Sequence, residues 1–335
     1  MKTSDFDYDL PPELIAQIPI EPRDAARLLQ LDRSSGVLGH FHFYQLPDLL
    51  RPGDLLVANE SRVIPARIFA HKAETGGAVE ILLLRRLDEV TWQALVRSHR
   101  VHVGTQNEVR PGLIAEVVEL SATGERVLRF NQPIDARLSE LGVMPLPPYI
   151  HAPLHDPERY QTIYAQTLGS AAAPTAGLHF TPRLLEQLRT RDIHMIYVTL
   201  HVGLDTFKPV ETEVIEQHHI HTEYMELTED VAARIRLAKA EGRRVIAVGT
   251  TSVRVLETAG ERSLSAFRGD TRLFIYPGFQ FRVIDGLITN FHLPKSSLLM
   301  LVAAFAGKEK IDRAYAEAIA RQYRFYSFGD AMLIL

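Results

Sequence analysis

Residues 245–254 carry side chains that together could bind an anionic or hydroxyl-rich ligand. Four apolar residues typical of a buried strand precede a glycine and three hydroxyl side chains, Thr250, Thr251 and Ser252. Free backbone N–H groups at the start of a helix would attract a carboxylate or a phosphate here, and Arg254 could add a fork-shaped contact. A plain helix cap with a solvated arginine is the alternative, and the sequence leaves both interpretations open.

A second candidate is the run of small residues from Ala171 to Gly177, which is followed by His179. Small side chains let the backbone approach a planar ligand closely, and a histidine can exchange protons near neutral pH. A tightly packed turn with a buried histidine would give the same pattern.

Further histidines follow a strongly apolar segment. His201 closes the predicted strand Ile196–Leu200, and His219, His221 and Glu223 come shortly after it. On a strand these last three side chains would share one face, with a spacing that suits a metal ion. They would equally suit a general base with an orienting carboxylate, or an exposed polar strand face.

Two groups of polar residues come directly after predicted buried strands. Asn59 and Arg62 follow Leu55–Ala58. The second group lies between a strand and a helix and contains Asn290, His292 and Lys295. Loops at strand ends often carry functional side chains, although a simple capping loop would look the same.

Alternating cations occur in the strand-rich part of the chain. They are Arg85, Arg86, Arg97 and Arg100, with histidines at positions 99 and 102. Such a stripe could follow the phosphates of a nucleic acid, and a solvated edge strand is the other interpretation.

The first 150 residues are predicted to contain mostly strands. Phe6–Leu10 reads as a short strand, and Pro11–Ala16 as a helix that begins at prolines. A hairpin follows with strands near Leu28–Leu31 and Phe41–Phe43. Further strand-like segments recur at 66–70, 79–84, 91–96, 116–119 and 126–130. Their spacing is typical of a compact β-barrel or sandwich, and the proline-rich stretch Met144–Tyr149 indicates a domain boundary.

Beyond that boundary, strands alternate with helices. The expected strands are Ile196–Leu200, Val245–Val248, Leu273–Tyr276 and Leu287–Thr289. The expected helices run from Thr181 through Leu188, from Thr228 to a stop at Gly242, and over Ser252–Ala259, Ser297–Ala306 and Ile311–Tyr323. Alternation of this kind favours a parallel or mixed sheet. We therefore predict a mixed-sheet α/β domain formed by 1–62 and 150–335, interrupted by a smaller, inserted, barrel-like all-β domain at 63–149.

The composition limits the class of protein. With 335 residues, 46% of them hydrophobic and 23% charged, the chain is expected to form folded domains. Its lack of cysteine excludes disulfides, thiolate catalysis and cysteine-ligated metals. The longest apolar run, Leu298–Ala306, is too short to cross a membrane, so a cytoplasmic protein is expected. The net charge of −4 argues only weakly against nucleic-acid binding, because a local basic stripe can supply the attraction.

The order of these motifs resembles the S-adenosylmethionine:tRNA ribosyltransferase-isomerase family of queuosine biosynthesis, essentially from end to end. The strings that carry the resemblance are Asp54–Arg67, Met144–Ile150, Ala173–Phe180, Thr199–Gly203, Gly249–Arg254, Ile275–Phe279, Thr289–Lys295 and Tyr323–Met332.

The resemblance implies an enzyme that moves the ribosyl part of S-adenosylmethionine onto the aminomethyl group of a 7-deazaguanine at the tRNA wobble position. Epoxyqueuosine would form, and adenine and methionine would be released. It implies S-adenosylmethionine as a cosubstrate, no permanently bound cofactor, no metal and no membrane. The expected partner is tRNA carrying the 7-deazaguanine precursor, and we expect a monomer.

On this resemblance the site residues fall into three groups. A general base is expected at His179, His201 or His221, because the ordinary pKa of histidine suits proton exchange at neutral pH. The residues expected to bind S-adenosylmethionine are Gly177, Thr250, Thr251, Ser252, Arg254 and His292. Those expected to contact tRNA are Asn59, Arg62, Arg97, Arg100 and Lys295.

Two positions depart from the family pattern. Glu60 stands where a second Asn is common, and Asp205 stands in place of a Gly. Two rival functions also remain: a metal-dependent hydrolase built on His219, His221 and Glu223, and a non-catalytic RNA-binding module. An ordinary methyltransferase is disfavoured, because no glycine-rich loop with a downstream acidic residue follows a first strand.

Overall fold

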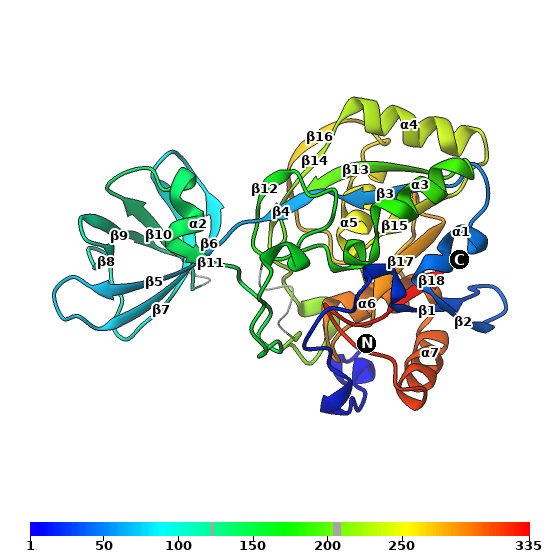
Figure 1. Ribbon diagram of the computed structural model, residues 1–335, viewed down its shortest axis with the longest axis horizontal. Coiled ribbons are helices and arrows are strands. Elements are labelled where there is room, and N and C mark those ends of the chain that lie inside the picture. Colours follow the sequence, from blue (N-terminus) through cyan, green and yellow to red (C-terminus); the bar gives the residue numbers. More distant parts are fainter. Residues whose placement is uncertain (122–123, 204–208) are drawn as a thin grey trace. The chain divides into compact units, whose positions relative to one another are not determined.

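The computed structural model describes residues 1–121, 124–203 and 209–335, which divide into two compact units (Figure 1). The first unit contains Met1–Ser61, Pro147–Thr167 and Ala173–Leu335, and the second contains Arg62–Leu146 and Leu168–Ala172. The predicted fold class, a mixed α/β sheet with an inserted β-barrel, is confirmed. The predicted domains, 1–62 with 150–335 and the insertion 63–149, stay a prediction about which residues fold as one domain.

The first unit is built on a nine-stranded sheet with the order β16-β14-β13-β3-β15-β17-β18-β1-β2. In that order the strands are Phe267–Thr271, Glu223–Leu227, His194–Leu200, Leu55–Asn59, Val245–Val248, Gly286–Asn290, Ala331–Ile334, Arg27–Leu31 and Leu38–His42. Strands β13, β3, β15 and β17 run parallel, as do β18 and β1. The other neighbouring pairs are antiparallel, so the sheet is mixed.

The centre of this sheet is buried along its whole length. Every residue of β3, β15 and β17 is buried, as expected for parallel strands that are covered on both faces. A core on one face joins Leu56, Val248 and Ile288 to Phe180 and Leu184. The carboxyl ends of these central strands are therefore held in place by the packed core.

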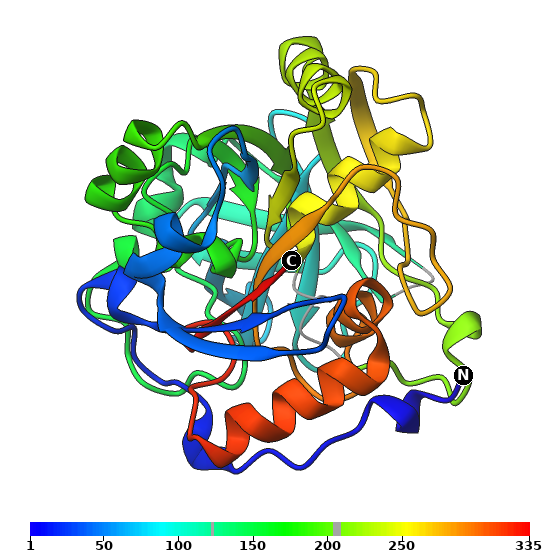
Figure 2. The same cartoon turned by 90° about the vertical axis from the view of Figure 1, so that its right-hand side faces the viewer.

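Three of the described helices begin after a capping side chain. The helices are α1 Leu46–Leu49, α2 Leu138–Leu141, α3 Pro182–Thr190, α4 Glu229–Ala240, α5 Thr250–Gly260, α6 Ser297–Ala306 and α7 Lys308–Ala320. The side chains of Thr181, Thr228 and Ser296 accept hydrogen bonds from the first turns of α3, α4 and α6. Helix α5 packs on β13 and β15, and α7 lies beside the β1–β2 hairpin (Figure 2).

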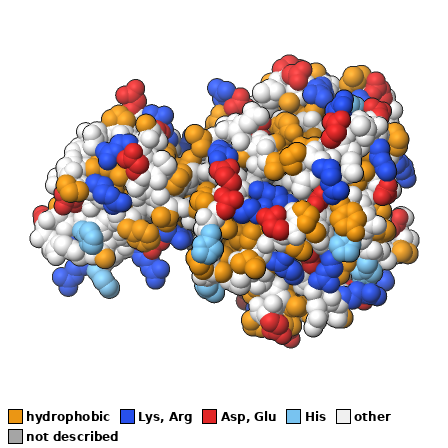
Figure 3. Space-filling model, viewed as in Figure 1, with side chains coloured by type: hydrophobic (Ala, Val, Ile, Leu, Met, Phe, Trp, Pro, Cys, Tyr) orange, Lys and Arg blue, Asp and Glu red, His pale blue; other side chains and the backbone are white. Residues whose placement is uncertain are grey.

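The second unit is an antiparallel barrel. Its strands, in sheet order, are β11 Gly142–Val143, β5 Arg67–Lys72, β6 Ala78–Arg86, β7 Thr91–Arg97, β10 Arg126–Phe130, β9 Leu113–Leu120 and β8 Gln106–Arg110. Pairing of β8 with β5 closes the barrel. A separate two-stranded pair is formed by β4 Ser61–Val63 and β12 Thr167–Ser170. Acidic and basic side chains are interspersed over the visible face of each unit (Figure 3).

Two of the predicted strands are wrong. Phe6–Leu10 is not a strand; a 3-10 turn covers Thr3–Phe6 and the next residues are irregular. The helix expected after it is only a 3-10 turn, Pro12–Leu14. Leu273–Tyr276 is also irregular, and the neighbouring strand, β16, ends before it at Thr271. Among the described residues, no helix is both long and apolar enough to cross a membrane.

Candidate active site

A pocket opens in the first unit beside the carboxyl ends of β15 and β17. Loops at such strand ends are the usual place for ligands in α/β sheets. The lining residues are Tyr149, Ala173, Pro174, Thr175, Ala176, Val202, Gly249, Thr250, Thr251, Thr289, Asn290, Phe291, His292, Leu293, Leu298, Tyr326 and Ser327. Several predicted strings thus meet at one cavity, although they are far apart along the chain.

The start of α5 forms one wall of the pocket. Gly249 precedes the helix with φ of +88°, a backbone conformation that favours glycine, and the helix has no side-chain cap. Thr250 and Thr251 both line the pocket, and Oγ1 of Thr251 is a buried atom without a hydrogen-bond partner. Backbone N–H groups and the positive end of an eleven-residue helix therefore face the cavity together with an unsatisfied hydroxyl.

Not every hydroxyl of this segment is available to a ligand. Ser252 is fully buried, and its Oγ donates back to the carbonyl oxygen of Val248 at 2.8 Å. Gly177 does not line the cavity; a Cβ there would lie 2.2 Å from the hydroxyl oxygen of Tyr164, so close packing accounts for this glycine. The sequence prediction that these two residues contact S-adenosylmethionine finds no support in this geometry.

The loop after β17 forms the opposite wall and contains His292. Its Nε2 lies 2.7 Å from Oγ1 of Thr289, and its backbone N–H donates to the hydroxyl oxygen of Tyr315 at 2.9 Å. Burial lowers the pKa of His292 to about 3, so its imidazole is neutral at physiological pH. The structure thus places a firmly held, neutral imidazole at the pocket.

His179, predicted as a candidate base, lies behind this wall and not in the lining of the pocket. It is 4% exposed, and Nδ2 of Asn290 approaches its Nε2 at 3.3 Å. Burial, aided by the positive charges of Arg324 and Arg23, lowers the pKa of His179 to about 3. Asn290 lines the pocket and His179 does not, so His179 contacts a lining residue without lining the pocket itself.

The other two candidate bases also lie outside the lining residues. His201 is half-buried directly after β13, with its ring stacked on Tyr224 at a centroid distance of 5.5 Å. Its neighbour Val202, but not His201, lines the pocket. His221 is exposed just before β14.

The arrangement proposed for a metal site is wrong. Strand β14 begins at Glu223, so His219 and His221 precede it and do not share a strand face with the carboxylate. Glu223 is buried, and it accepts a hydrogen bond from Nη1 of Arg254 and another, at 3.0 Å, from the backbone N–H of Gly203. Within the described ranges, no group of three or more His, Asp or Glu is placed to hold a metal ion.

Arg254 serves a buried ion pair and does not line the pocket. Its Nε donates to the carbonyl oxygen of Leu273 at 3.1 Å, and its Nη1 binds Glu223. Its Nη2 is buried without a hydrogen-bond partner. Burial lowers the pKa of Arg254 to about 10, which still leaves it charged at neutral pH. The prediction of a direct carboxylate contact by Arg254 finds no support in this placement.

The residues predicted to contact tRNA have different surroundings. Asn59 is fully buried, and its amide both donates to and accepts from the backbone of Leu200, so it is not accessible to an RNA. Arg62 is half-buried on β4. Lys295 is 41% exposed and pairs with Asp7 at 2.6 Å.

The basic residues of the barrel unit are exposed. Arg97 ends β7, and Arg100 lies in the following turn, where Nζ of Lys72 donates to its carbonyl oxygen at 3.1 Å. Arg85 is exposed, and Arg86 is exposed but pairs with Asp135 at 3.3 Å. Arg97 and Arg100 therefore keep the surface position that a phosphate contact needs.

The two departures from the family pattern have different outcomes. Glu60 is half-buried beside the hydroxyl of Thr167 at 3.4 Å, and burial raises the pKa of its carboxyl group. Asp205 lies outside the described residues.

Three lining residues, Tyr149, Tyr326 and Ser327, are not among the site residues predicted from the sequence. Tyr149 and Ser327 are joined by a hydrogen bond of 2.7 Å, and the rings of Tyr149 and Tyr326 lie 4.8 Å apart. All three belong to the strings that carry the family resemblance. That membership was the only signal, because tyrosine and serine in loops are not distinctive by themselves.

The fold is that of an α/β protein with a pocket at the carboxyl ends of its sheet strands. A family model described as queuosine biosynthesis protein matches residues 3–334. S-adenosylmethionine:tRNA ribosyltransferase-isomerases from Moorella thermoacetica and Carboxydothermus hydrogenoformans are 55% and 54% identical, with full coverage of both chains. A crystal structure of S-adenosylmethionine tRNA ribosyltransferase from Thermotoga maritima matches with 42% identity and a TM-score of 0.58, covering 99% of this chain and 100% of that one.

This chain belongs to the queuosine biosynthesis protein family. The resemblance found in the sequence motifs is thereby confirmed.

Proposed function

We propose that this protein is an S-adenosylmethionine:tRNA ribosyltransferase-isomerase. It transfers the ribosyl part of S-adenosylmethionine to the aminomethyl group of a 7-deazaguanine at the tRNA wobble position, giving epoxyqueuosine with release of adenine and methionine. The observation that carries this proposal is the match to the family and to its named enzymes along the whole chain. The proposal includes no permanently bound cofactor, a monomeric enzyme and a cytoplasmic location.

The pocket supports the proposal by its chemistry. The N-terminus of α5, with Thr250 and Thr251, offers hydrogen-bond donors for the methionine carboxylate or the ribose hydroxyls. Small side chains from Ala173 to Ala176 and the rings of Tyr149 and Tyr326 suit the planar adenine.

The chemistry requires a base and a proton donor in a pocket with little water. A sulfonium acidifies the neighbouring ribose carbon, so a base can remove a C5′ proton before adenine leaves, the RNA amine attacks and methionine departs. We propose that a histidine handles these protons, and we add His292 to His179, His201 and His221, because His292 lines the pocket. Burial keeps the ring of His292 neutral, and the low pKa also makes it a weaker base than an exposed histidine.

The two predicted domains have separate tasks in this proposal. The discontinuous α/β domain, 1–62 with 150–335, holds S-adenosylmethionine. The inserted domain, 63–149, contributes the exposed Arg97 and Arg100 to contacts with tRNA phosphates.

Adenine release tests the function directly. The protein is incubated with S-adenosylmethionine and either tRNA carrying the aminomethyl 7-deazaguanine or the same tRNA with guanine at that position. We expect free adenine and methionine in equal amounts, and only with the modified tRNA. No adenine with the modified tRNA, or equal release without it, would contradict the proposal.

A further inference from the structure

The C-terminal segment forms a closed loop, 324–330, whose two ends are tied together. The backbone N–H of Asp330 donates to the carbonyl oxygen of Arg324 at 2.8 Å, and the N–H of Arg324 donates to Oδ2 of Asp330 at 2.7 Å. Inside the loop, the N–H of Gly329 donates to the carbonyl oxygen of Tyr326 at 3.0 Å. Tyr326 has φ of +68°, which is uncommon for a residue other than glycine and indicates that the surroundings impose the loop conformation.

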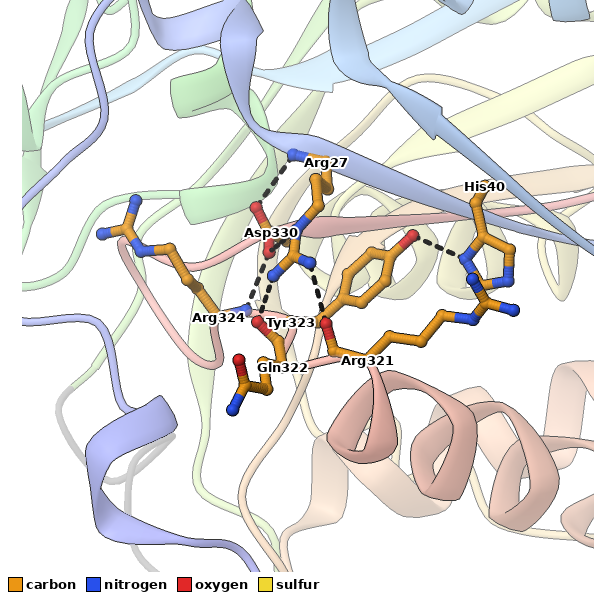
Figure 4. A network of polar contacts seen from close by, with 7 residues as sticks. All are labelled: Arg27, His40, Arg321, Gln322, Tyr323, Arg324 and Asp330. Carbon is orange, nitrogen blue, oxygen red and sulfur yellow. Dashed lines mark hydrogen bonds and ion pairs between the residues drawn. The ribbon is translucent and has the colours of Figure 1, made fainter.

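The carboxylate of Asp330 is the centre of a polar network (Figure 4). Asp330 is 1% exposed, and its Oδ1 accepts from the backbone N–H of Arg27 at 2.8 Å. Its Oδ2 accepts from Nε of Arg27 at 3.1 Å. The Arg27 guanidinium also donates to the carbonyl oxygens of Arg321 and Gln322 and lies over the ring of Tyr323, 4.2 Å from its centroid. One carboxylate and one guanidinium therefore fix β1 and both ends of the loop.

The far side of this loop is a wall of the pocket. The carbonyl oxygen of Tyr326 accepts from Nδ2 of Asn290 at 3.2 Å, and the N–H of Tyr326 donates to the carbonyl oxygen of Phe291, also at 3.2 Å. The hydroxyl of Ser327 lies 2.7 Å from that of Tyr149. The five residues in these contacts all line the cavity. A shift of the loop would therefore move polar atoms in the wall of the cavity.

We propose that Asp330 and Arg27 are positioning residues for the enzyme: they hold loop 324–330 so that Tyr326 and Ser327 shape the site for S-adenosylmethionine. A buried carboxylate that accepts hydrogen bonds from two backbone N–H groups and a guanidinium fixes the backbone segments on both sides of it. Neither side chain lines the pocket, so both act through the loop. This inference rests on the proposed function, which names the ligand.

Asp330→Asn and Arg27→Lys are the variants that test it. Asp330→Asn removes the negative charge but keeps the size of the side chain. Arg27→Lys keeps the positive charge but loses the guanidinium, which donates to Asp330 and to two carbonyl oxygens. Asp312→Asn is the matched control, because Asp312 is an exposed carboxylate on α7 that pairs with Lys308. The full-length wild type is assayed first for adenine release; absence of turnover there would refute the proposed function and not the positioning role.

With active wild type, we expect the KM for S-adenosylmethionine to rise roughly ten-fold or more in both variants, since small misplacements of binding groups are costly. Asp312→Asn should keep the wild-type KM. A merely structural role would lower the amount of folded enzyme, and so the apparent kcat, without moving the KM. An unchanged KM in folded Asp330→Asn and Arg27→Lys would overturn the inference.

Gly329→Ala offers an independent variant in case Asp330→Asn does not fold. A Cβ at this position would lie 2.4 Å from the carbonyl oxygen of Arg324, so the loop must shift to admit it, while the network around Asp330 keeps its groups. We expect a raised KM for S-adenosylmethionine here as well. A wild-type KM in this folded variant would show that the loop does not shape the site.

Discussion

Two adjacent hydroxyl side chains at the start of α5 have opposite environments. Ser252 bonds back to Val248, whereas the buried Oγ1 of Thr251 has no hydrogen-bond partner and lies at the pocket. The sequence indicated a ligand site at this turn but could not separate these residues, because either hydroxyl can cap a helix or bind a ligand. Which one is available depends on helix phase and on the packing of distant segments.

Thr251→Val should weaken binding of S-adenosylmethionine. A hydrogen bond to a charged group contributes about 1.5–3 kcal/mol, so we expect the KM to rise about ten-fold or more. Removing an unsatisfied buried hydroxyl should cost little stability. Steady-state kinetics with saturating tRNA, together with a thermal melt, measures both effects.

Thr258→Val is the matched control for this change. Thr258 lies on the same helix, and its hydroxyl is 2.8 Å from that of Thr271, away from the pocket. It should lower stability by about 1 kcal/mol and leave the KM unchanged. If Thr251→Val kept the wild-type KM, the α5 N-terminus would not be part of the ligand site.

At the scale of elements, the sequence predicted those helices and strands whose signals are local. The caps at Thr181 and Thr228, and the glycine after α6 at position 307, mark helix ends that the structure reproduces closely. Strands that are held mainly by backbone pairing were missed. Polar β8 closes the barrel, and polar β16 pairs with β14 along its full length, so neither has an apolar pattern.

The buried pair between Arg254 on α5 and Glu223 on β14 is the element-scale contact with the clearest expected cost. Arg254→Ala would leave the carboxylate of Glu223 buried without its guanidinium. We expect the free energy of unfolding to fall by about 3–5 kcal/mol, measured by urea denaturation.

Arg234→Ala, on an exposed position of α4, is the control and should change stability by less than about 0.5 kcal/mol. If the free energy of unfolding of Arg254→Ala fell by no more than that of the control, the ion pair would not hold α5 to the sheet. Arg254 would then have to be reconsidered as a ligand contact.

At the scale of the whole molecule, the sequence could indicate the insertion but not the strand order. The N-terminal strands β1, β2 and β3 join a sheet whose other members come after residue 190, and β3 lies between β13 and β15. Such pairings depend on contacts between segments more than a hundred residues apart. The same holds for the pocket, whose lining comes from distant strings that no local pattern joins.

Two buried histidines make stability depend on pH. Burial lowers the pKa of His179 and of His292 to about 3, whereas an unfolded histidine has a pKa of about 6.5. The unfolded chain therefore binds more protons below pH 6.5, so stability is full above that value and is lost as the pH falls toward 3.

His179→Gln removes one of the two side chains that the unfolded chain protonates and the folded protein keeps neutral. Between pH 6 and pH 4, we expect its free energy of unfolding to fall less steeply than that of wild type, by about 1.4 kcal/mol per pH unit. Urea denaturation at several pH values measures the slope. Equal slopes would show that His179 is not held neutral in the folded protein.

Affinity for tRNA should depend on salt although the chain is acidic. Residues 62–146 hold 11 Lys and Arg against 10 Asp and Glu, so any attraction must come from a local stripe and not from net charge. Replacing Arg97 and Arg100 together by Ala should reduce the slope of log K against log salt by about 2. Arg234→Ala should retain the wild-type slope, and a double variant that also retains it would exclude the stripe.

The mass of the wobble nucleoside tests the central claim most directly. tRNA carrying the aminomethyl 7-deazaguanine is incubated with wild-type protein and S-adenosylmethionine, digested to nucleosides and analysed by mass spectrometry. We expect the modified nucleoside to gain the ribose-derived unit of epoxyqueuosine. A gain of a single CH₂ unit, or no change of mass with folded protein, would contradict the account.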